Sequence, residues 1–536
     1  MKITLTIAAL MFGLFGETPA AHAFCGFYVA GSDQPMFNDA TQVVLMRKGT
    51  RTVLAMQNTY KGPPQDFAMV VPVPVVLHEG DVKTLPKQVF DDVERMSAPR
   101  LVEYWEQDPC YKEPERQYDM AVAEAAPPRA MMGSGAGGGY QVTVEAKFAV
   151  GEYNIEILSA KDSTGLDAWL TDHNYKIPAG AEPLLRPYVE TGSKWFVARV
   201  DPNKVKVVDG HVALSPLRFH YDSEELALPI RLGLANSNGT QDLIVNIIAP
   251  DQRYEVANYK NVTIPTNLDV TDAVRDNFPA FYAALYDRTV ERNPGAVVTE
   301  YSWAAGSCDP CPGPTLTPET LETLGLDVID AFTPAQQAAH DAMIAARNAL
   351  NDAARDYQNR DAYQQAFDRY NALAAKAPPE TQFWNMVLTR LHARYGKDIT
   401  NDLVFKQADP IEGGREFGGV GQGAEKASTN NFQARYAIRH KWTGPITCLD
   451  PQRGRWGGPP AGTEGDTSAK PALGLAFAPR GGLKLEDAFT KDVPELAVKK
   501  HATGCGCQSS DPAGLLAALV LGAFGFFRPR RRGERQ

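Results

Sequence analysis

The chain has 536 residues, more than an average single domain, and 44% of them are hydrophobic, so it can bury a sizeable core. Its formal net charge is -10. The stretch from Cys505 to the end carries five Arg against one Asp and one Glu, so the rest of the chain is more acidic than the total indicates. Such a body repels phosphate backbones, and we therefore expect no nucleic-acid partner.

Residues 1–23 have the pattern of a secretory signal peptide. A basic Lys2 precedes an apolar run from Ile3 to Phe15, and "AHA" at 21–23 fits the A-x-A cleavage site of signal peptidase. This pattern predicts export across the inner membrane and a mature chain that starts at Phe24. A leader that stays uncut as a short anchor is the alternative.

The following segments alternate between strand patterns and short helices. Hairpins are predicted around Lys48-Gly49-Thr50 and around Gly151. Pro72 and Pro74 predict that the run 67–77 is an edge strand or an irregular one. Helices are predicted at 86–96 and 164–174, a mobile loop at 121–139, and successive strands at 194–200, 211–221, 228–236 and 242–250.

Residues 333–378 change to a helical pattern. Thr333, Pro334 and Gln336 form a helix start with a capping box. Apolar residues then recur at coiled-coil spacing, and the prolines at 378 and 379 end the helix: Ala339, Met343, Ala346, Leu350, Ala353 and Tyr357, then Tyr363, Phe367, Tyr370 and Ala374. We predict an antiparallel helical hairpin that packs on itself, with one long helix and a partner-binding groove as alternatives.

These patterns predict an α+β fold, a mostly antiparallel β-sheet body with short helices and an inserted helical hairpin. The body would span 24–332 and continue, again β-rich, over 379–450, with expected strands at 383–396, 402–409 and 431–442. The Pro- and Gly-rich residues 451–502 are interpreted as a flexible stalk.

The tail, 503–536, combines Gly504-Cys505-Gly506-Cys507, an apolar run from Ala513 to Phe527 and an Arg-rich end. At 1.5 Å per residue the run covers about 22 Å, short of the roughly 30 Å hydrocarbon core. The arginines should stay on the cytoplasmic side. A plain transmembrane anchor with a local disulfide is one interpretation.

These three parts, in this order, resemble the myxobacterial C-terminal sorting signal. The resemblance implies that a sorting protease cuts the tail and that Cys505 or Cys507 is lipidated, which would hold the protein on the membrane at the cell surface. Six body segments, among them "SAPRLVEYWEQDPC" at 97–110, "LTRLHARYG" at 388–396 and "NFQARYAIRH" at 431–440, resemble the bacterial domain of unknown function 2330 family over about Cys25 to Cys448. That family implies no activity or catalytic residue.

Sequence motifs of the common enzyme classes are missing. There is no H-E-x-x-H, G-x-S-x-G or P-loop, and the glycines at 133, 135 and 138 follow no strand, so we predict no catalytic, cofactor or metal residues. The "CDPC" at 308–311 is a redox candidate, although structural disulfides are the default in an exported protein. The disulfide or redox candidates are Cys25, Cys110, Cys308, Cys311 and Cys448.

Three hypotheses follow. The preferred one is an exported, surface-anchored, non-enzymatic binding or structural module of the cell envelope. The second is an extracytoplasmic thiol-disulfide protein that uses Cys308 and Cys311. The third is a hydrolase whose carboxylate pair forms only in the fold.

Overall fold

The computed structural model describes residues 27–30, 37–38, 42–57, 59–61, 67–111, 142–173, 175, 181–208, 211–236, 240–308, 313–330, 332–355, 359–378, 381–396, 398–415, 423–460, 469–475, 481 and 483–500. The predicted leader, the loop at 121–139, Cys25, Cys311 and the whole tail with Cys505 and Cys507 lie outside these ranges.

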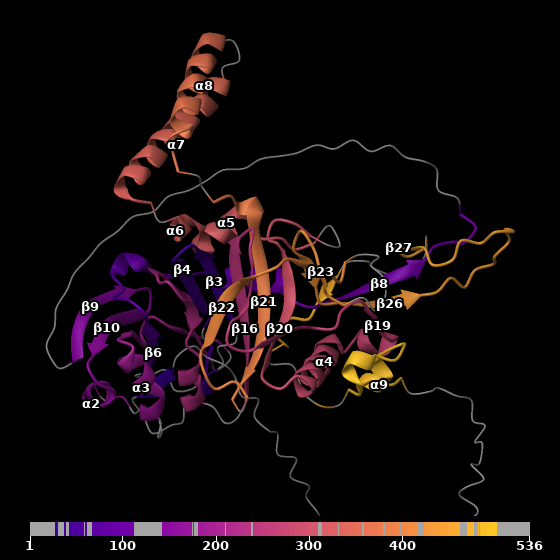
Figure 1. Ribbon diagram of the computed structural model, residues 1–536, viewed down its shortest axis with the longest axis horizontal. Coiled ribbons are helices and arrows are strands. Elements are labelled where there is room, and N and C mark those ends of the chain that lie inside the picture. Colours follow the sequence, from indigo (N-terminus) through magenta and orange to yellow (C-terminus); the bar gives the residue numbers. More distant parts are fainter. Residues whose placement is uncertain are drawn as a thin grey trace, which may run out of the picture.

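The fold is α+β with a sheet-rich body, as the sequence predicts (Figure 1). A large mixed sheet runs through its centre, and β18 (Lys260–Thr263) pairs with β20 at one side. The main path of this sheet follows the order β24 (Glu425–Lys426), β23 (Ile411–Gly413), β25 (Asn431–Gln433), β20 (Ala296–Ala304), β21 (Met386–Tyr395), β16 (Gln241–Pro250), β3 (Gln42–Lys48), β4 (Arg51–Gln57), β14 (Leu217–Asp222) and β7 (Val82–Thr84).

A second sheet packs on one face of the central sheet across the main apolar core, to which Leu45, Val245, Ile155 and Phe196 contribute. Helices α2 (Ser163–Asp172) and α3 (Glu182–Glu190) cover the outer side of this second sheet. The second sheet has the order β1 (Phe27–Ala30), β6 (Phe67–Val73), β11 (Lys194–Val200), β10 (Tyr153–Ala160) and β9 (Val142–Val150).

The opposite face of the central sheet is covered by helices. One group packs there through Phe90, Leu321 and Leu324: α1 (Gln88–Ser97), α5 (Pro318–Leu321), the π-helical turn Glu322–Leu326 and α6 (Asp327–Ile329). The longest body helix, α4 (Phe278–Arg292), packs beside them through Phe281 and Tyr282. The sequence patterns did not predict α4, because apolar residues occur on most of its faces.

Three smaller sheets complete the body. One, drawn at the right of Figure 1, joins segments far apart in the sequence, because β8 (Arg100–Glu106) runs parallel to β26 (Arg435–His440). Its other strands are β19 (Leu268–Asp269), β27 (Trp456–Gly457) and β28 (Lys470–Pro471). Another has the strand order β12 (Lys206–Val208), β13 (His211–Ala213), β5 (Thr59–Lys61) and β2 (Phe37–Asn38). The last has the order β15 (Leu226–Leu228), β22 (Leu403–Ala408) and β17 (Arg253–Val256).

The predicted hairpin turns and the predicted edge strand at Pro72 have different outcomes. The hairpins turn at Gly49 and Gly151, whose φ angles of 55° and 58° favour glycine. The strand with Pro72 is not at a sheet edge, since β6 lies between β1 and β11. However, β1 pairs only with Phe67–Val70, so on that side Pro72 needs no amide hydrogen.

The inserted hairpin is present as two helices, α7 (Pro334–Arg355) and α8 (Arg360–Ala374), and it projects from the body (Figure 1). The capping box forms as predicted: the Thr333 amide donates to Gln336 Oε1 at 3.0 Å, and the Gln336 amide donates to Thr333 Oγ1 at 3.3 Å. Met343 and Ala346 are buried in the seam. The prediction for α8 was wrong in one respect, because Tyr363 and Phe367 are exposed.

The interpretation of 451–502 as a flexible stalk was also wrong for its described part. β27 and β28 both pair with β8. Further along, α9 (Leu485–Ala488) and the turn Pro494–Leu496 bury Leu485, Phe489 and Val498 against α4. The apolar residues that recur in this segment are too widely spaced to show a helical or strand period, yet they complete a core. The division of the chain into domains stays a prediction.

Candidate functional site

The densest group of buried charges lies where β21 crosses the middle of the central sheet. Arg390, His392 and Arg394 alternate along β21 and share one face, because successive strand residues point to opposite sides. On the neighbouring strand β16, Asn246 lies opposite Arg390 and Asp242 lies opposite Arg394. The strand register therefore places a row of basic side chains beside a row of polar ones.

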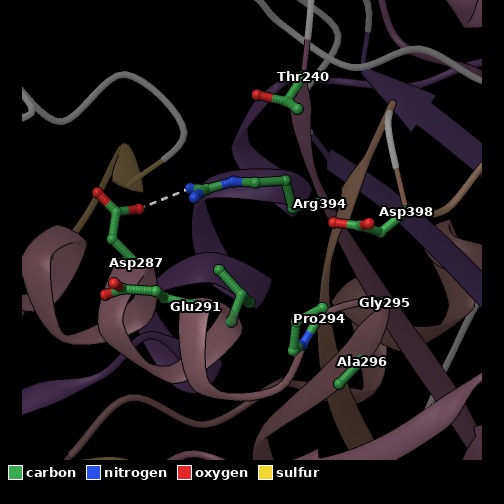
Figure 2. Close-up of a pocket in the computed structure, with 9 residues that line it drawn as sticks. Thr240, Asp287, Glu291, Pro294, Gly295, Ala296, Arg394 and Asp398 are labelled. Carbon is green, nitrogen blue, oxygen red and sulfur yellow. Dashed lines mark hydrogen bonds and ion pairs between the residues drawn. The ribbon is translucent and has the colours of Figure 1, made fainter.

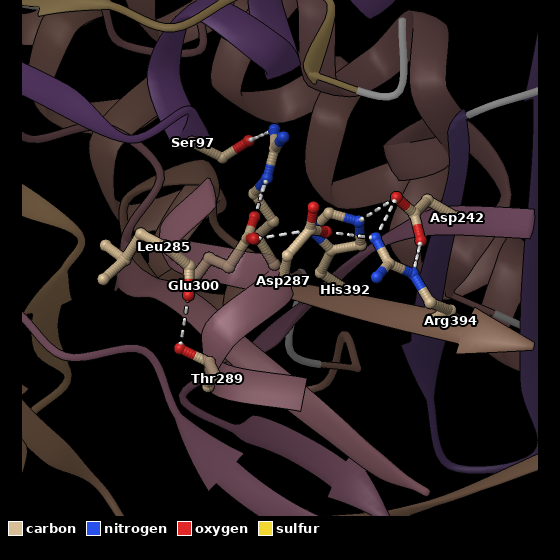
Figure 3. Close-up of polar contacts among 9 residues, drawn as sticks. Ser97, Asp242, Leu285, Asp287, Thr289, Glu300, His392 and Arg394 are labelled. Carbon is tan, nitrogen blue, oxygen red and sulfur yellow. Dashed lines mark hydrogen bonds and ion pairs between the residues drawn. The ribbon is translucent and has the colours of Figure 1, made fainter. Parts of the chain in front are cut away.

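A β-bulge brings Glu300 into this row. In the pairing of β20 with β21, Thr299 lies opposite Leu391 and Tyr301 opposite Arg390, which leaves Glu300 as the extra residue. A bulge redirects the side chain of such a residue. Glu300 Oε2 accepts a hydrogen bond from Arg390 Nε at 2.7 Å, and its Oε1 lies 2.7 Å from His392 Nδ1 (Figure 3).

The outer part of the network reaches α4. Arg394 binds both carboxylate oxygens of Asp242, at 2.7 and 2.9 Å, and donates to Asp287 Oδ1 at 2.7 Å (Figure 3). His392 Nε2 lies 3.8 Å from Asp242. The Tyr286 ring stacks on the imidazole, with centroids 3.6 Å apart and planes within 8°. His392 is thus enclosed by two carboxylates and an aromatic ring.

These contacts keep the network ionised. Burial alone would raise the pKa of Glu300, but the charges of His392 and Arg390 outweigh it, and the pKa falls to about 2. Burial would likewise raise the pKa of Asp242, which His392 and Arg394 hold well below its usual range. For His392, burial favours the neutral form, yet the Glu300 charge raises its pKa above the ordinary value. The two neighbouring carboxylates thus favour the protonated imidazole.

A shallow pocket of about 200 Å³ opens at the outer end of the network (Figure 2). Arg394 and Asp287 form one wall, and Glu291 and Asp398 contribute further carboxylates. Arg394 is already bound to two carboxylates, so its charge is neutralised within the protein. The one cationic side chain of the lining is therefore already paired, and the other charged residues that line the pocket are carboxylates, Asp287, Glu291 and Asp398.

A second ionic cluster holds the small sheet around β8 to the body. Glu103 accepts two hydrogen bonds from Arg275, both at 2.9 Å, and lies 2.9 Å from His440 Nε2. The hydrogen bonds from Arg275 outweigh burial and lower the pKa of Glu103 to about 2. Since Arg275 follows β19 and His440 ends β26, this carboxylate joins three separate chain segments.

The predicted cysteine sites fall into two groups. Cys110 and Cys448 form a disulfide across 338 residues of sequence, with Cα atoms 5.5 Å apart. Cys308 is disulfide-bonded as well, and its partner lies outside the described residues. Cys25, Cys311, Cys505 and Cys507 also lie outside them, so the structure tests neither the C-x-x-C pair nor the tail motif.

Two other kinds of feature do not occur in the described ranges. Within these ranges, no group of three or more His, Cys, Asp or Glu side chains is arranged to hold a metal ion. No helix in the same ranges has the length and apolar character needed to cross a membrane.

Sequence reasoning missed the buried network. The alternation of Arg390, His392 and Arg394 in "LTRLHARYG" is visible, but such a pattern usually marks the solvent face of a strand. Glu300 carries no sequence signal, because the sheet register and the bulge bring it to partners about 90 residues away. The fold brings two carboxylates, Glu300 and Asp242, to opposite nitrogens of His392, which lies between them.

Comparison with known proteins gives one match. No curated protein and no solved structure is similar to the chain. Residues 19–406 match a family described as an uncharacterized protein conserved in bacteria, DUF2330. This match covers well over half of the sequence and includes β21 with the buried network. The chain therefore belongs to the DUF2330 family.

Proposed function

We propose that the protein is exported and held at the cell surface as a non-enzymatic binding or structural module of the envelope. The observation that carries this proposal is the Cys110–Cys448 disulfide, which ties the end of β8 to the segment after β26. Disulfides persist in oxidising compartments and are rare in a reducing cytosol. The pattern of a signal peptide at residues 1–23 supports the same location.

A structural role for the buried charges supports the non-enzymatic part of the proposal. Arg390 and Glu300 have fully buried side chains, and His392 is 2% exposed. A group that acts on a substrate has to be within hydrogen-bonding reach of it. Here the substrate would have to displace an ion pair in the sheet interior, so we assign the network to holding α4 on the sheet.

The tail is the proposed means of attachment. A sorting protease would remove the apolar run and the arginines, and a lipid on Cys505 or Cys507 would hold the protein on the membrane. We expect the double substitution Cys505→Ala/Cys507→Ala to leave export intact, to abolish surface retention and to accumulate the uncut precursor. Ser509→Ala/Ser510→Ala in the same tail is the matched control and should stay at the surface.

Intact mass spectrometry of the surface form decides between sorting and a plain anchor. The expected form starts at Phe24, lacks the Arg-rich end and carries lipid mass on one cysteine. A surface form that starts at Met1, or one that keeps its arginines, would count against signal peptidase cleavage or against sorting, respectively. Fully reduced Cys110 and Cys448 in protein taken directly from cells would contradict export itself.

The thiol-disulfide alternative depends on Cys308, which is disulfide-bonded. Differential alkylation under mild reductant tests it in the native protein. If Cys308 and Cys311 open while Cys110–Cys448 stays closed, and the opened pair reduces a protein disulfide, the alternative replaces the proposal. If every disulfide resists, the cysteines are structural.

A further inference from the structure

An apolar stripe runs along α8, and its first two residues, Tyr363 and Phe367, are exposed, whereas Tyr370 and Ala374 further along are half-buried. Tyr363, Phe367, Tyr370 and Ala374 follow the 4-3-4 spacing of a coiled-coil seam. The side chains of Tyr363 and Phe367 are 41% and 39% exposed. Their rings stack, with centroids 6.2 Å apart and planes 16° from parallel, and so form one continuous apolar surface.

The packing of α8 on α7 takes place through a different stripe. Ala362, Ala366 and Leu373 are half-buried and lie about a quarter-turn from the aromatic residues. On α7, the buried residues are Met343 and Ala346. The exposed rings of Tyr363 and Phe367 therefore lie outside this seam.

We propose that the aromatic stripe of α8 binds the same stripe of a second copy, with the two helices antiparallel. A two-fold axis near Phe367 then places Phe367 against its own counterpart and Tyr363 near Tyr370 of the second copy. Arg360 of each chain meets the small Ala374 at the other end. The centre of the contact is therefore aromatic, and a small residue lies at each end.

Charge complementarity favours this occupant. Arg360 would lie beside the C-terminal turn of the second copy's α8, where backbone carbonyls carry partial negative charge and attract a cation. The positions that flank the stripe on its open side are Gln364 and Asn371, both exposed and uncharged. Because these two side chains are uncharged, they do not repel the same side chains of a second copy. They also offer no ion pair to a partner that is recognised by its charge.

The position of the hairpin makes the contact accessible. α7 and α8 project from the body, so two hairpins can overlap with the bodies at opposite ends (Figure 1). One pair of helices of 15 residues buries less surface than a standard stable interface. We therefore expect a weak dimer, with a dissociation constant on the order of micromolar.

Site-directed crosslinking of the full exported chain tests the geometry. Because the two-fold axis passes near residue 367, Phe367→Cys should give a disulfide-linked dimer under mild oxidation. Gln365→Cys, exposed on another side of the same helix, is the matched control and should crosslink no more than the wild type. Equal crosslinking of both variants would overturn the antiparallel seam.

Sedimentation equilibrium of the wild type measures the affinity independently of any cysteine. Phe367→Glu should raise the dissociation constant at least about tenfold and leave the circular dichroism unchanged, because the side chain is outside the hairpin seam. A wild-type chain that is monomeric at hundreds of micromolar would refute the proposal, and so would a dimer that Phe367→Glu does not weaken. These results do not depend on surface anchoring and would leave that proposal untouched.

Discussion

Glu300 links two buried basic side chains of the network. It contacts both Arg390 and His392 at 2.7 Å, and all three side chains are almost fully inaccessible to water. Removing one partner of a buried ion pair leaves an uncompensated charge, which costs about 3–5 kcal/mol.

The first prediction is that Glu300→Gln lowers the free energy of unfolding by about this amount, roughly 3–5 kcal/mol. Urea denaturation followed by circular dichroism measures it. Glu291→Gln is the control, because Glu291 is 67% exposed and its pair with Arg288 spans 3.4 Å, so it should change stability by less than about 0.5 kcal/mol. A Glu300 variant as stable as the control would show that the network is dispensable.

The second prediction concerns the free energy of unfolding at acid pH. The pKa of Glu300 in the folded protein is about 2, against an ordinary value of 4.5, so the folded state favours the carboxylate. Its stabilising effect is present above pH 4.5 and is lost as the pH falls towards 2. The shift corresponds to about 3 kcal/mol. Unfolding free energies measured from pH 6 to pH 2.5 should therefore converge for wild type and Glu300→Gln. Parallel curves would contradict the assignment.

What the sequence could predict at this scale differs from residue to residue. The turns at Gly49 and Gly151 were predictable, because a positive φ is a local requirement that glycine meets. The burial of Arg390 and His392 was not, since helices pack over their face of the sheet: Tyr286 of α4 stacks on His392, and Arg390 donates to Ser97 Oγ of α1 at 3.3 Å. Local pattern indicates a strand, but only the tertiary fold decides which of its faces meets water.

At the scale of elements, the helical hairpin joins the body at two neighbouring points of the chain. Its entry and exit are held together at the neck, where Asp330 accepts hydrogen bonds from the Thr381 amide at 2.9 Å and from Thr381 Oγ1 at 2.8 Å. Asp330 also pairs with Lys48 of β3. The body thus holds both ends of the insertion together through Asp330.

The third prediction follows from this neck. A deletion that joins Phe332 to Ala377 should keep the strand-rich circular dichroism and a cooperative melt within a few degrees of the wild type, because Asp330 and Thr381 already lie in contact. Differential scanning calorimetry provides the measurement. The same deletion with Asp330→Ala should melt lower. Loss of cooperativity in the simple deletion would mean that the hairpin belongs to the core.

Elements with strong local patterns were predictable, and those defined by packing were not. The capping box at Thr333 and the proline that follows it fix the start of α7 in the sequence itself. In contrast, Leu485, Phe489 and Val498 are scattered among prolines, charges and glycines. Such a segment has the composition of a linker. That its apolar residues belong to the core is evident only in the fold, where they pack against α4.

At the scale of the whole molecule, strands from the C-terminal part of the body pair with strands from its earlier part. The family match ends at residue 406, yet β25 and β26 beyond it pair with β20 and β8 and bury Phe432 and Tyr436. The Cys110–Cys448 bond fastens this closure covalently. The C-terminal strands are therefore part of the core and not an appendage.

The fourth prediction is that Cys110→Ser/Cys448→Ser lowers the free energy of unfolding by about 2–4 kcal/mol, because the unfolded chain regains the freedom of a very long loop. Chemical denaturation without reductant tests it. Tyr111→Phe, beside Cys110 and 54% exposed, is the control and should be neutral. An unchanged midpoint in the double variant would show that noncovalent contacts alone close the body.

The packed C-terminal segment also sets how far the protein could stand from a membrane. Val498 is fixed in the core, and Lys500 is the last described residue. If the tail is processed at Cys505 or Cys507, only five to seven residues separate Lys500 from the lipid, a reach of roughly 17–25 Å. The α9 side of the body would then lie close to the bilayer, while the hairpin, on the opposite side in Figure 1, would extend away from the membrane into the medium.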